Sequence, residues 1–169
     1  MAAIAVLVGP PGAGKTTIGQ AVASALGVPF ADADALIQQR AGKPIPDIFA
    51  DEGEPAFRAL EQAVIAESLQ TLGGVLSLGG GAILDESTRK LLAEQTVVFL
   101  SVELSEAVKR VGSGSGRPLL ATDPRATMKV LLEQRGPLYA SVATYTVATD
   151  GREPEEIAAE VGALLSPLT

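Results

Sequence analysis

The chain has 169 residues, an ordinary globular composition with 47% hydrophobic residues, and a formal net charge of −7. The negative charge disfavours binding to nucleic acid, and no apolar run reaches the roughly 18 residues that a membrane-spanning helix needs. The absence of cysteine and histidine excludes disulfides, thiolate nucleophiles and zinc clusters, and it leaves Asp, Glu, Lys or Tyr as a general base. The opening MAAIAVLVG has no basic segment, so we interpret it as a first strand and expect a cytoplasmic protein.

Apolar runs that suit strands alternate with segments of helical periodicity along the whole chain. We expect strands at residues 2–8, 28–32, 75–78, 96–102 and 145–148. We expect helices at 18–27, 33–40, 86–93, 105–111, 124–135 and 153–165, and a short helix followed by a long one between 45 and 72. The helix from 124 either ends at 135 or continues with a kink at Pro137. This alternation predicts one α/β domain over residues 1–169, with a five-stranded parallel sheet covered by helices on both faces.

A glycine-rich loop, GPPGAGKTT at residues 9–17, stands between the first strand and the first helix. It matches the P-loop pattern G-x-x-x-x-G-K-[ST] in full. In such a loop backbone N–H groups hold phosphate oxygens, Lys15 reaches the β- and γ-phosphates, and the Thr16 hydroxyl ligates Mg²⁺. An ordinary strand-to-helix turn is the alternative. The position of the motif favours nucleoside-triphosphate binding and a three-layer α/β/α P-loop NTPase fold.

Two carboxylates, Asp32 and Asp34, follow the second strand. The chain has no guanine-reading N-K-x-D segment and is short for a motor or transporter ATPase, which leaves the small-molecule kinases. A spacing of two puts both carboxylates on one side of an extended chain, at the sheet edge where ligands bind. One would hold Mg²⁺ through water, and the other would accept a hydroxyl proton. The alternative makes Asp34 merely the N-cap of the next helix.

Three consecutive glycines, Gly79, Gly80 and Gly81, follow the third strand at the same expected edge. Side chains there would fill the space in which a ligand lies against the backbone, so the triplet predicts a floor of N–H groups beneath a compact polar acceptor. The alternative is a loose turn. Because no carboxylate ends this strand, the metal-binding role falls to Asp32.

Two arginines have positions that suit an acidic substrate, and a third suits the transferred phosphate. Arg58 opens the long helix, and Arg135 precedes Gly136-Pro137. Two guanidinium groups that converge on one pocket would bind a carboxylate in bidentate fashion. Arg117 lies in GSGSGRPLLATD, about 112–123, which we interpret as a mobile lid that closes on the transferred phosphate. For each arginine the alternative is a solvated surface charge.

Together these segments resemble shikimate kinase, a family of the nucleoside-monophosphate-kinase-like P-loop group. The likeness covers nearly the whole chain, in GPPGAGKTTIG, DADALI, IPDIFADEGEPAFRALE, LSLGGGAI, RPLL, RGPLY and GREP. Its most specific part is D-I-F-x-x-x-G-E-x-x-F-R-x-x-E, inside a substrate-binding region of about 33–61. The chain departs from the family at LSL, where many members place Thr beside the glycines, and at Ala140-Ser141, where an acidic residue is frequent.

The resemblance implies ATP-dependent phosphorylation of the 3-hydroxyl of shikimate, in the pathway to chorismate and the aromatic amino acids, by a monomer that uses Mg²⁺. The implied catalytic residues are Lys15, Asp34 and Arg117, with Asp34 as base or orienter of the hydroxyl. The implied ATP-binding residues are Gly12, Ala13, Gly14, Lys15, Thr16, Thr17, Arg110, Arg117, Arg152 and Pro154, and the metal ligands are Thr16 and Asp32. The implied substrate-binding residues are Asp34, Phe49, Phe57, Arg58, Glu61, Gly79, Gly80, Gly81 and Arg135.

Two other functions fit part of the pattern. A gluconate or nucleotide kinase would share the fold, but the paired arginines and the glycine triplet favour a compact carboxylated polyol. A nucleotide-sensing domain would bind ATP without transferring phosphate. The intact set of Lys15, Thr16, Asp32 and Asp34 favours transfer over sensing.

Overall fold

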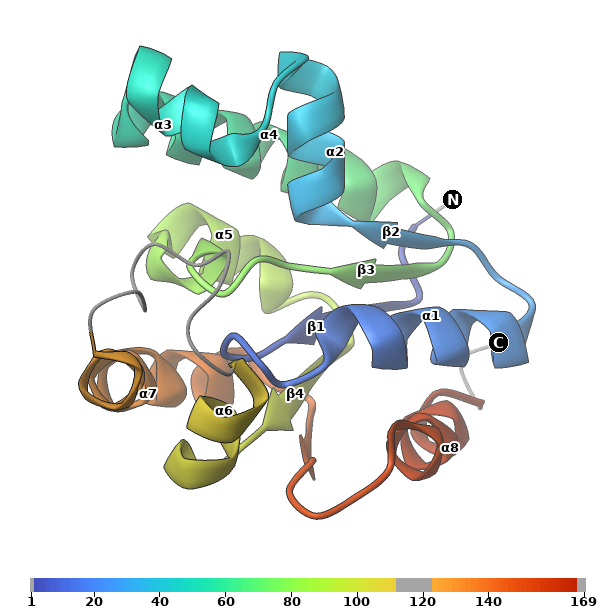
Figure 1. Cartoon of the computed structure of the whole chain (residues 1–169). Helices are drawn as coiled ribbons and strands as arrows, with labels where there is room; N and C mark the ends of the chain where they lie inside the picture. The colour runs from blue at the N-terminus through green and yellow to red at the C-terminus, as the bar shows by residue number, and fades with distance from the viewer. Residues whose placement is uncertain (1, 112–122, 167–169) are drawn as a thin grey trace.

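A parallel five-stranded sheet forms the centre of the computed structural model, which describes residues 2–111 and 123–166. The strand order is β2-β3-β1-β4-β5, so the first strand lies in the middle of the sheet (Figure 1). The strands are β1 (Ala5–Val8), β2 (Phe30–Asp32), β3 (Val75–Ser77), β4 (Val97–Ser101) and β5 (Tyr145–Ala148). The predicted fold class is confirmed. The first two strands begin later than expected, at Ala5 and Phe30.

Helices cover both faces of the sheet (Figure 1). They are α1 (Lys15–Leu26), α2 (Ala33–Ala41), α3 (Ile45–Glu52), α4 (Glu54–Thr71), α5 (Glu86–Leu92), α6 (Leu104–Val111), α7 (Pro124–Val142) and α8 (Pro154–Leu165), with a 3₁₀ helix, η1 (Ala82–Leu84). The helix from Pro124 continues through Pro137 to Val142 as one element. No described helix is both long enough and apolar enough to cross a membrane.

The two faces of the sheet form two separate cores, because side chains alternate along each strand. Ala5 and Leu7 of β1 pack with α1 and α8, whereas Val6 and Val8 pack with α4, α5 and the end of α7. A third, smaller core joins α2, α3 and α4 through Ile37, Ile48, Phe57 and Val64. This third core lies beyond β2 (Figure 1) and places the predicted substrate-binding region beside the carboxyl ends of the strands.

Candidate active site

The glycine-rich loop connects the end of β1 to the first residue of α1, Lys15. Gly14 is the N-cap of α1 with φ 87°, a left-handed conformation that glycine adopts without strain. At Gly9 a side chain would begin 2.6 Å from the Leu100 carbonyl oxygen, so the loop packs directly on β4. The Lys15 ammonium donates hydrogen bonds to the carbonyl oxygens of Gly9 (2.8 Å) and Pro10 (3.1 Å). The side chain of Lys15 therefore lies across the P-loop and is bonded to carbonyl oxygens of that loop.

Asp32 joins the end of β2 to the P-loop. One of its carboxylate oxygens accepts from the Asp34 backbone N–H (2.9 Å), and the other accepts from the Thr16 hydroxyl (3.2 Å). Asp32 is thus the N-cap of α2. The alternative that made Asp34 the cap is wrong, because α2 begins at Ala33, two residues before the position that this alternative required. The side chain of Asp34 lies against the glycine triplet instead.

Each glycine of the triplet adjoins a polar side chain of the candidate site. A β-carbon at Gly79 would lie 2.6 Å from an Asp34 carboxylate oxygen, and one at Gly81 would lie 2.7 Å from an Arg58 guanidinium nitrogen. A β-carbon at Gly80 would lie 3.5 Å from an Arg135 nitrogen. The sequence analysis predicted that a ligand lies directly against these glycines. In the structure the protein's own side chains lie there. The triplet forms the turn between β3 and η1, and this turn brings Asp34, Arg58 and Arg135 together.

Arg58 is held in place by its neighbours on α4. Its guanidinium donates to the Glu61 carboxylate (2.8 Å) and lies 5.2 Å from the centre of the Phe57 ring. Phe57 in turn stacks on Phe49 at 4.7 Å, and Phe49 keeps 37% of its surface exposed. The predicted residues Phe49, Phe57 and Glu61 therefore form the support of Arg58.

Burial raises the pKa of Glu61 above its ordinary value of 4.5, and the hydrogen bond and charge of Arg58 oppose that rise. A carboxyl with a raised pKa binds its proton more readily in the folded protein than in the unfolded chain. Its contribution to the free energy of unfolding is therefore largest at low pH and is lost as the pH rises through the folded-state pKa.

Tyr139 is a site residue that the sequence analysis missed. It lies on α7, one helical turn after Arg135, and its hydroxyl donates to the Gly80 carbonyl oxygen (2.7 Å). Burial raises its pKa to about 12, with Arg135 acting in the opposite direction, so the phenol is neutral at physiological pH. The spacing of four residues to Arg135 within RGPLY was the available signal.

Two adjoining cavities lie at the carboxyl ends of the strands. The first, of about 340 Å³, is lined by the P-loop together with Asp32, Asp34, Ser77, Gly79 and Gly80. The second, of about 230 Å³, shares the P-loop glycines and Arg110 with the first and adds Arg152 and Pro154. The predicted phosphate and metal residues thus meet Asp34, Gly79 and Gly80 of the predicted acceptor site in one cavity, and the predicted adenine contacts meet in the next. Arg58 and Arg135 line neither cavity.

Both arginines of the second cavity are anchored. Arg110 donates to the carbonyl oxygens of Gly12 (3.2 Å) and Thr149 (2.7 Å) and to the Thr149 hydroxyl (2.9 Å). Arg152 pairs with Glu160 at 2.7 Å on α8. Both side chains line the cavity while most of their donor groups bond to other parts of the protein. Arg117 and the predicted lid lie outside the described residues, except Asp123, which caps α7.

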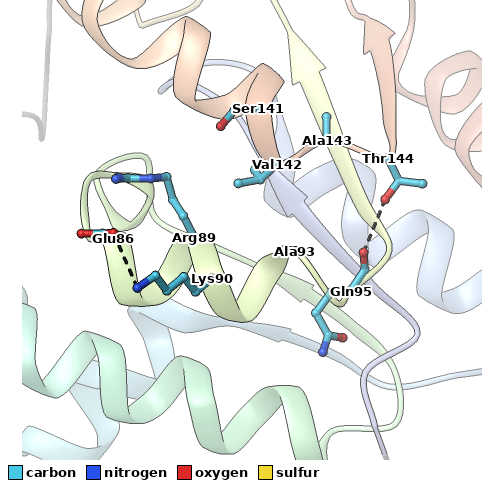
Figure 2. A pocket seen from close by; sticks show the side chains of 9 residues that line it. All are labelled: Glu86, Arg89, Lys90, Ala93, Gln95, Ser141, Val142, Ala143 and Thr144. Atoms are coloured by element: carbon cyan, nitrogen blue, oxygen red, sulfur yellow. Dashed lines mark hydrogen bonds and ion pairs between the residues drawn. The ribbon is translucent and has the colours of Figure 1, made fainter.

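A larger hollow, of about 520 Å³, lies elsewhere. Figure 2 shows Glu86, Arg89 and Lys90 of α5 on one side of it, and residues 141–144 from the end of α7 on the other. Gln95 and Thr144, which also line it, precede β4 and β5. It therefore adjoins the opposite edge of the sheet and contains no predicted site residue.

The oxygen donors of Thr16 and Asp32 suit Mg²⁺. The hydroxyl and the carboxylate lie 3.2 Å apart beside the P-loop. Among the described residues no group of three Asp, Glu, His or Cys side chains gathers as an all-protein metal site. Mg²⁺ is commonly held by one or two carboxylates plus substrate phosphates and waters, and this donor set fits that pattern.

A P-loop beside a cavity lined by two carboxylates, with two further arginines at the adjoining glycine triplet, at the carboxyl edge of a parallel sheet, defines a P-loop kinase. The family profile of shikimate kinase matches residues 11–166. The chain belongs to the shikimate kinase family, and the predicted family and the prediction of an enzyme are confirmed.

Individual relatives agree with that assignment. The shikimate kinase of Salinispora arenicola is 62% identical over 98% of this chain and 99% of its own length. The structure of shikimate kinase from Acinetobacter baumannii in complex with shikimate has a TM-score of 0.91 and 37% identity, and covers 99% of this chain and 94% of that one. A gluconokinase structure from Sinorhizobium meliloti reaches a TM-score of only 0.60 at 26% identity, covering 97% of this chain and 91% of that one. The rival prediction of a gluconate kinase is therefore the weaker one.

Proposed function

We propose that this protein transfers the γ-phosphoryl group of ATP to the 3-hydroxyl of shikimate, giving shikimate 3-phosphate and ADP on the route to chorismate and the aromatic amino acids. One observation carries the proposal: the glycine triplet brings Asp34, Arg58 and Arg135 together beside the P-loop. An acid with several hydroxyl groups is the acceptor that such a set of side chains suits.

Arg58 and Arg135 bind the carboxylate of the acceptor. They come from α4 and α7 and approach the triplet from two directions, which suits bidentate recognition of a planar anion. Asp34 binds the hydroxyl groups and aligns the attacking oxygen. Phe49, Phe57 and Glu61 act through Arg58, which they support.

The P-loop residues Gly12 to Thr17 hold the phosphates of ATP. Lys15 leaves the carbonyl oxygens of Gly9 and Pro10, to which it donates in this structure, and turns its ammonium to the β- and γ-phosphates. Thr16 and Asp32 hold Mg²⁺, which when bound neutralises phosphate charge. Arg110, Arg152 and Pro154 bind the adenine side, where a guanidinium can lie on the face of a base. The role of Arg117 at the transferred phosphate rests on sequence alone.

Phosphoryl transfer needs positioning and charge stabilisation more than covalent chemistry. Asp34 fixes the acceptor hydroxyl in line with the γ-phosphorus and takes up its proton as the oxygen–phosphorus bond forms. Lys15 stabilises the negative charge on the transferred and leaving phosphates. The monomeric state, the cytoplasmic location and the absence of nucleic-acid and membrane partners stay predictions.

A coupled assay of ADP release with shikimate, with gluconate and with no acceptor tests the proposed function. We expect ADP release to depend on shikimate, and Asp34→Asn to lower kcat by on the order of 10²- to 10⁴-fold while ATP binding is retained. Equal ADP release without an acceptor, or a preference for gluconate, would contradict the proposed substrate. Asp34→Asn activity within about threefold of the wild type would remove Asp34 from the mechanism.

A further inference from the structure

The buried hydroxyl of Tyr139 stands between two parts of the acceptor site. It donates to the Gly80 carbonyl oxygen at 2.7 Å. A β-carbon at Gly80 would lie 3.4 Å from this hydroxyl and 3.5 Å from the nearest Arg135 nitrogen. The hydroxyl, the middle glycine of the triplet and the Arg135 guanidinium therefore meet at one point.

The phenolic oxygen can serve both neighbours at once. Its proton is used toward Gly80, and its lone pairs are available to accept from a guanidinium N–H. The Arg135 guanidinium lies beside the same glycine, and its positive charge lowers the pKa of Tyr139 against the effect of burial. The phenolic oxygen therefore bonds to the backbone between β3 and η1 at the place where the charged side chain of Arg135 approaches it.

The ring of Tyr139 is fixed by the core, which fixes the hydroxyl in turn. Tyr139 is only 1% exposed, and its ring lies 5.3 Å from the ring of Phe99 on β4. Between Arg135 and Tyr139 the helix contains Pro137, which has no N–H and so removes one backbone hydrogen bond from that turn.

We propose that Tyr139 is a positioning residue for the acceptor carboxylate, because its hydroxyl holds the Arg135 guanidinium and the Gly80 backbone in a fixed relation. The proposal rests on the proposed function, which assigns Arg135 to that carboxylate. Tyr139 lines neither the P-loop cavity nor the cavity beside Arg152. Its loss should therefore weaken acceptor binding and leave ATP binding unchanged.

The test compares Tyr139→Phe, which removes the hydroxyl and keeps the ring, with Tyr145→Phe as a matched control. Tyr145 is the first residue of β5 and packs against the other core, at the opposite edge of the sheet. We expect Tyr139→Phe to raise KM for shikimate about tenfold, because the loss of one buried hydrogen bond usually has an effect of about this size. KM for ATP should stay within about twofold, and Tyr145→Phe should change neither constant.

A purely structural role for the hydroxyl predicts a different result. In that case the substitution Tyr139→Phe would lower the melting temperature of the protein without a selective rise in KM for shikimate. That outcome would overturn the inference. Failure of Tyr139→Phe to fold, judged by circular dichroism, would overturn it as well, because the hydroxyl would then serve the fold.

Two further measurements separate the possible failures. In an Arg135→Gln background, Tyr139→Phe should add less than about twofold to KM for shikimate, and a full additive effect would refute action through Arg135. If the wild type turns over shikimate and Tyr139→Phe matches it, the inference alone fails. If the wild type neither binds nor turns over shikimate, the proposed function fails and the inference falls with it.

Discussion

Replacing Gly79 by alanine should damage catalysis far more than stability. The new methyl group would lie 2.6 Å from a carboxylate oxygen of Asp34, whereas ordinary contacts begin at 3.4 Å. The carboxylate must therefore retreat by about 0.8 Å, the difference between these two distances. Because this atom is the end of a side chain, it can move without disturbing the backbone.

A displacement of about 1 Å at a reacting group can cost roughly 10²-fold in rate. We therefore expect Gly79→Ala to lower kcat by about 10²-fold, with a small change in melting temperature. Gly81→Ala, whose methyl group would lie 2.7 Å from Arg58, should instead raise KM for shikimate. The two variants would separate the alignment of the hydroxyl from the binding of the carboxylate.

Steady-state kinetics with varied shikimate and varied ATP measures both effects. Gly162→Ala on α8 is the matched control, because a β-carbon there meets nothing within 4 Å. This control should keep full activity and gain up to about 1 kcal/mol of stability from better helix propensity. A Gly79→Ala enzyme with wild-type kcat would refute the reasoning that the glycine exists to admit Asp34.

Two other predictions concern carboxylates near the site. Asp32→Asn should keep the N-cap of α2, since asparagine caps as well as aspartate, while the Mg²⁺ concentration for half-maximal activity rises; an unchanged Mg²⁺ requirement would exclude Asp32 from the metal site. For Glu61→Gln, urea unfolding at pH values above and below 4.5 should show the wild type losing stability relative to the variant as the pH rises, because burial raises the pKa of Glu61. If the wild type instead gained stability relative to the variant as the pH rises, the effect of Arg58 would outweigh that of burial, and the pKa of Glu61 would be lowered.

The sequence predicted the order of elements well, because their signals are local. Strand runs and helical periodicity depend on neighbouring residues, and the prediction for β5 (Tyr145–Ala148) matches the structure at both ends. The P-loop was recognisable for the same reason, since its residues are contiguous. The structure extends α7 past Pro137, a position at which the sequence left two outcomes open.

The contacts within the site could not be predicted, because they join distant segments. Nothing in the sequence indicates that Gly79 adjoins Asp34 while Gly81 adjoins Arg58. The same holds for the bond between the Tyr139 hydroxyl and Gly80, which are 59 residues apart. The sequence analysis correctly predicted that glycine is needed at the triplet because another group approaches the backbone closely. It predicted that this group is the ligand, whereas in the structure it is a side chain of the protein.

A crystal structure with shikimate and ADP bound would test the central claim most directly. We predict that the acceptor carboxylate contacts Arg58 and Arg135 and that its 3-hydroxyl lies beside Asp34, facing the P-loop. A shikimate ring found away from the glycine triplet, for example in the hollow between α5 and the end of α7 (Figure 2), would contradict it.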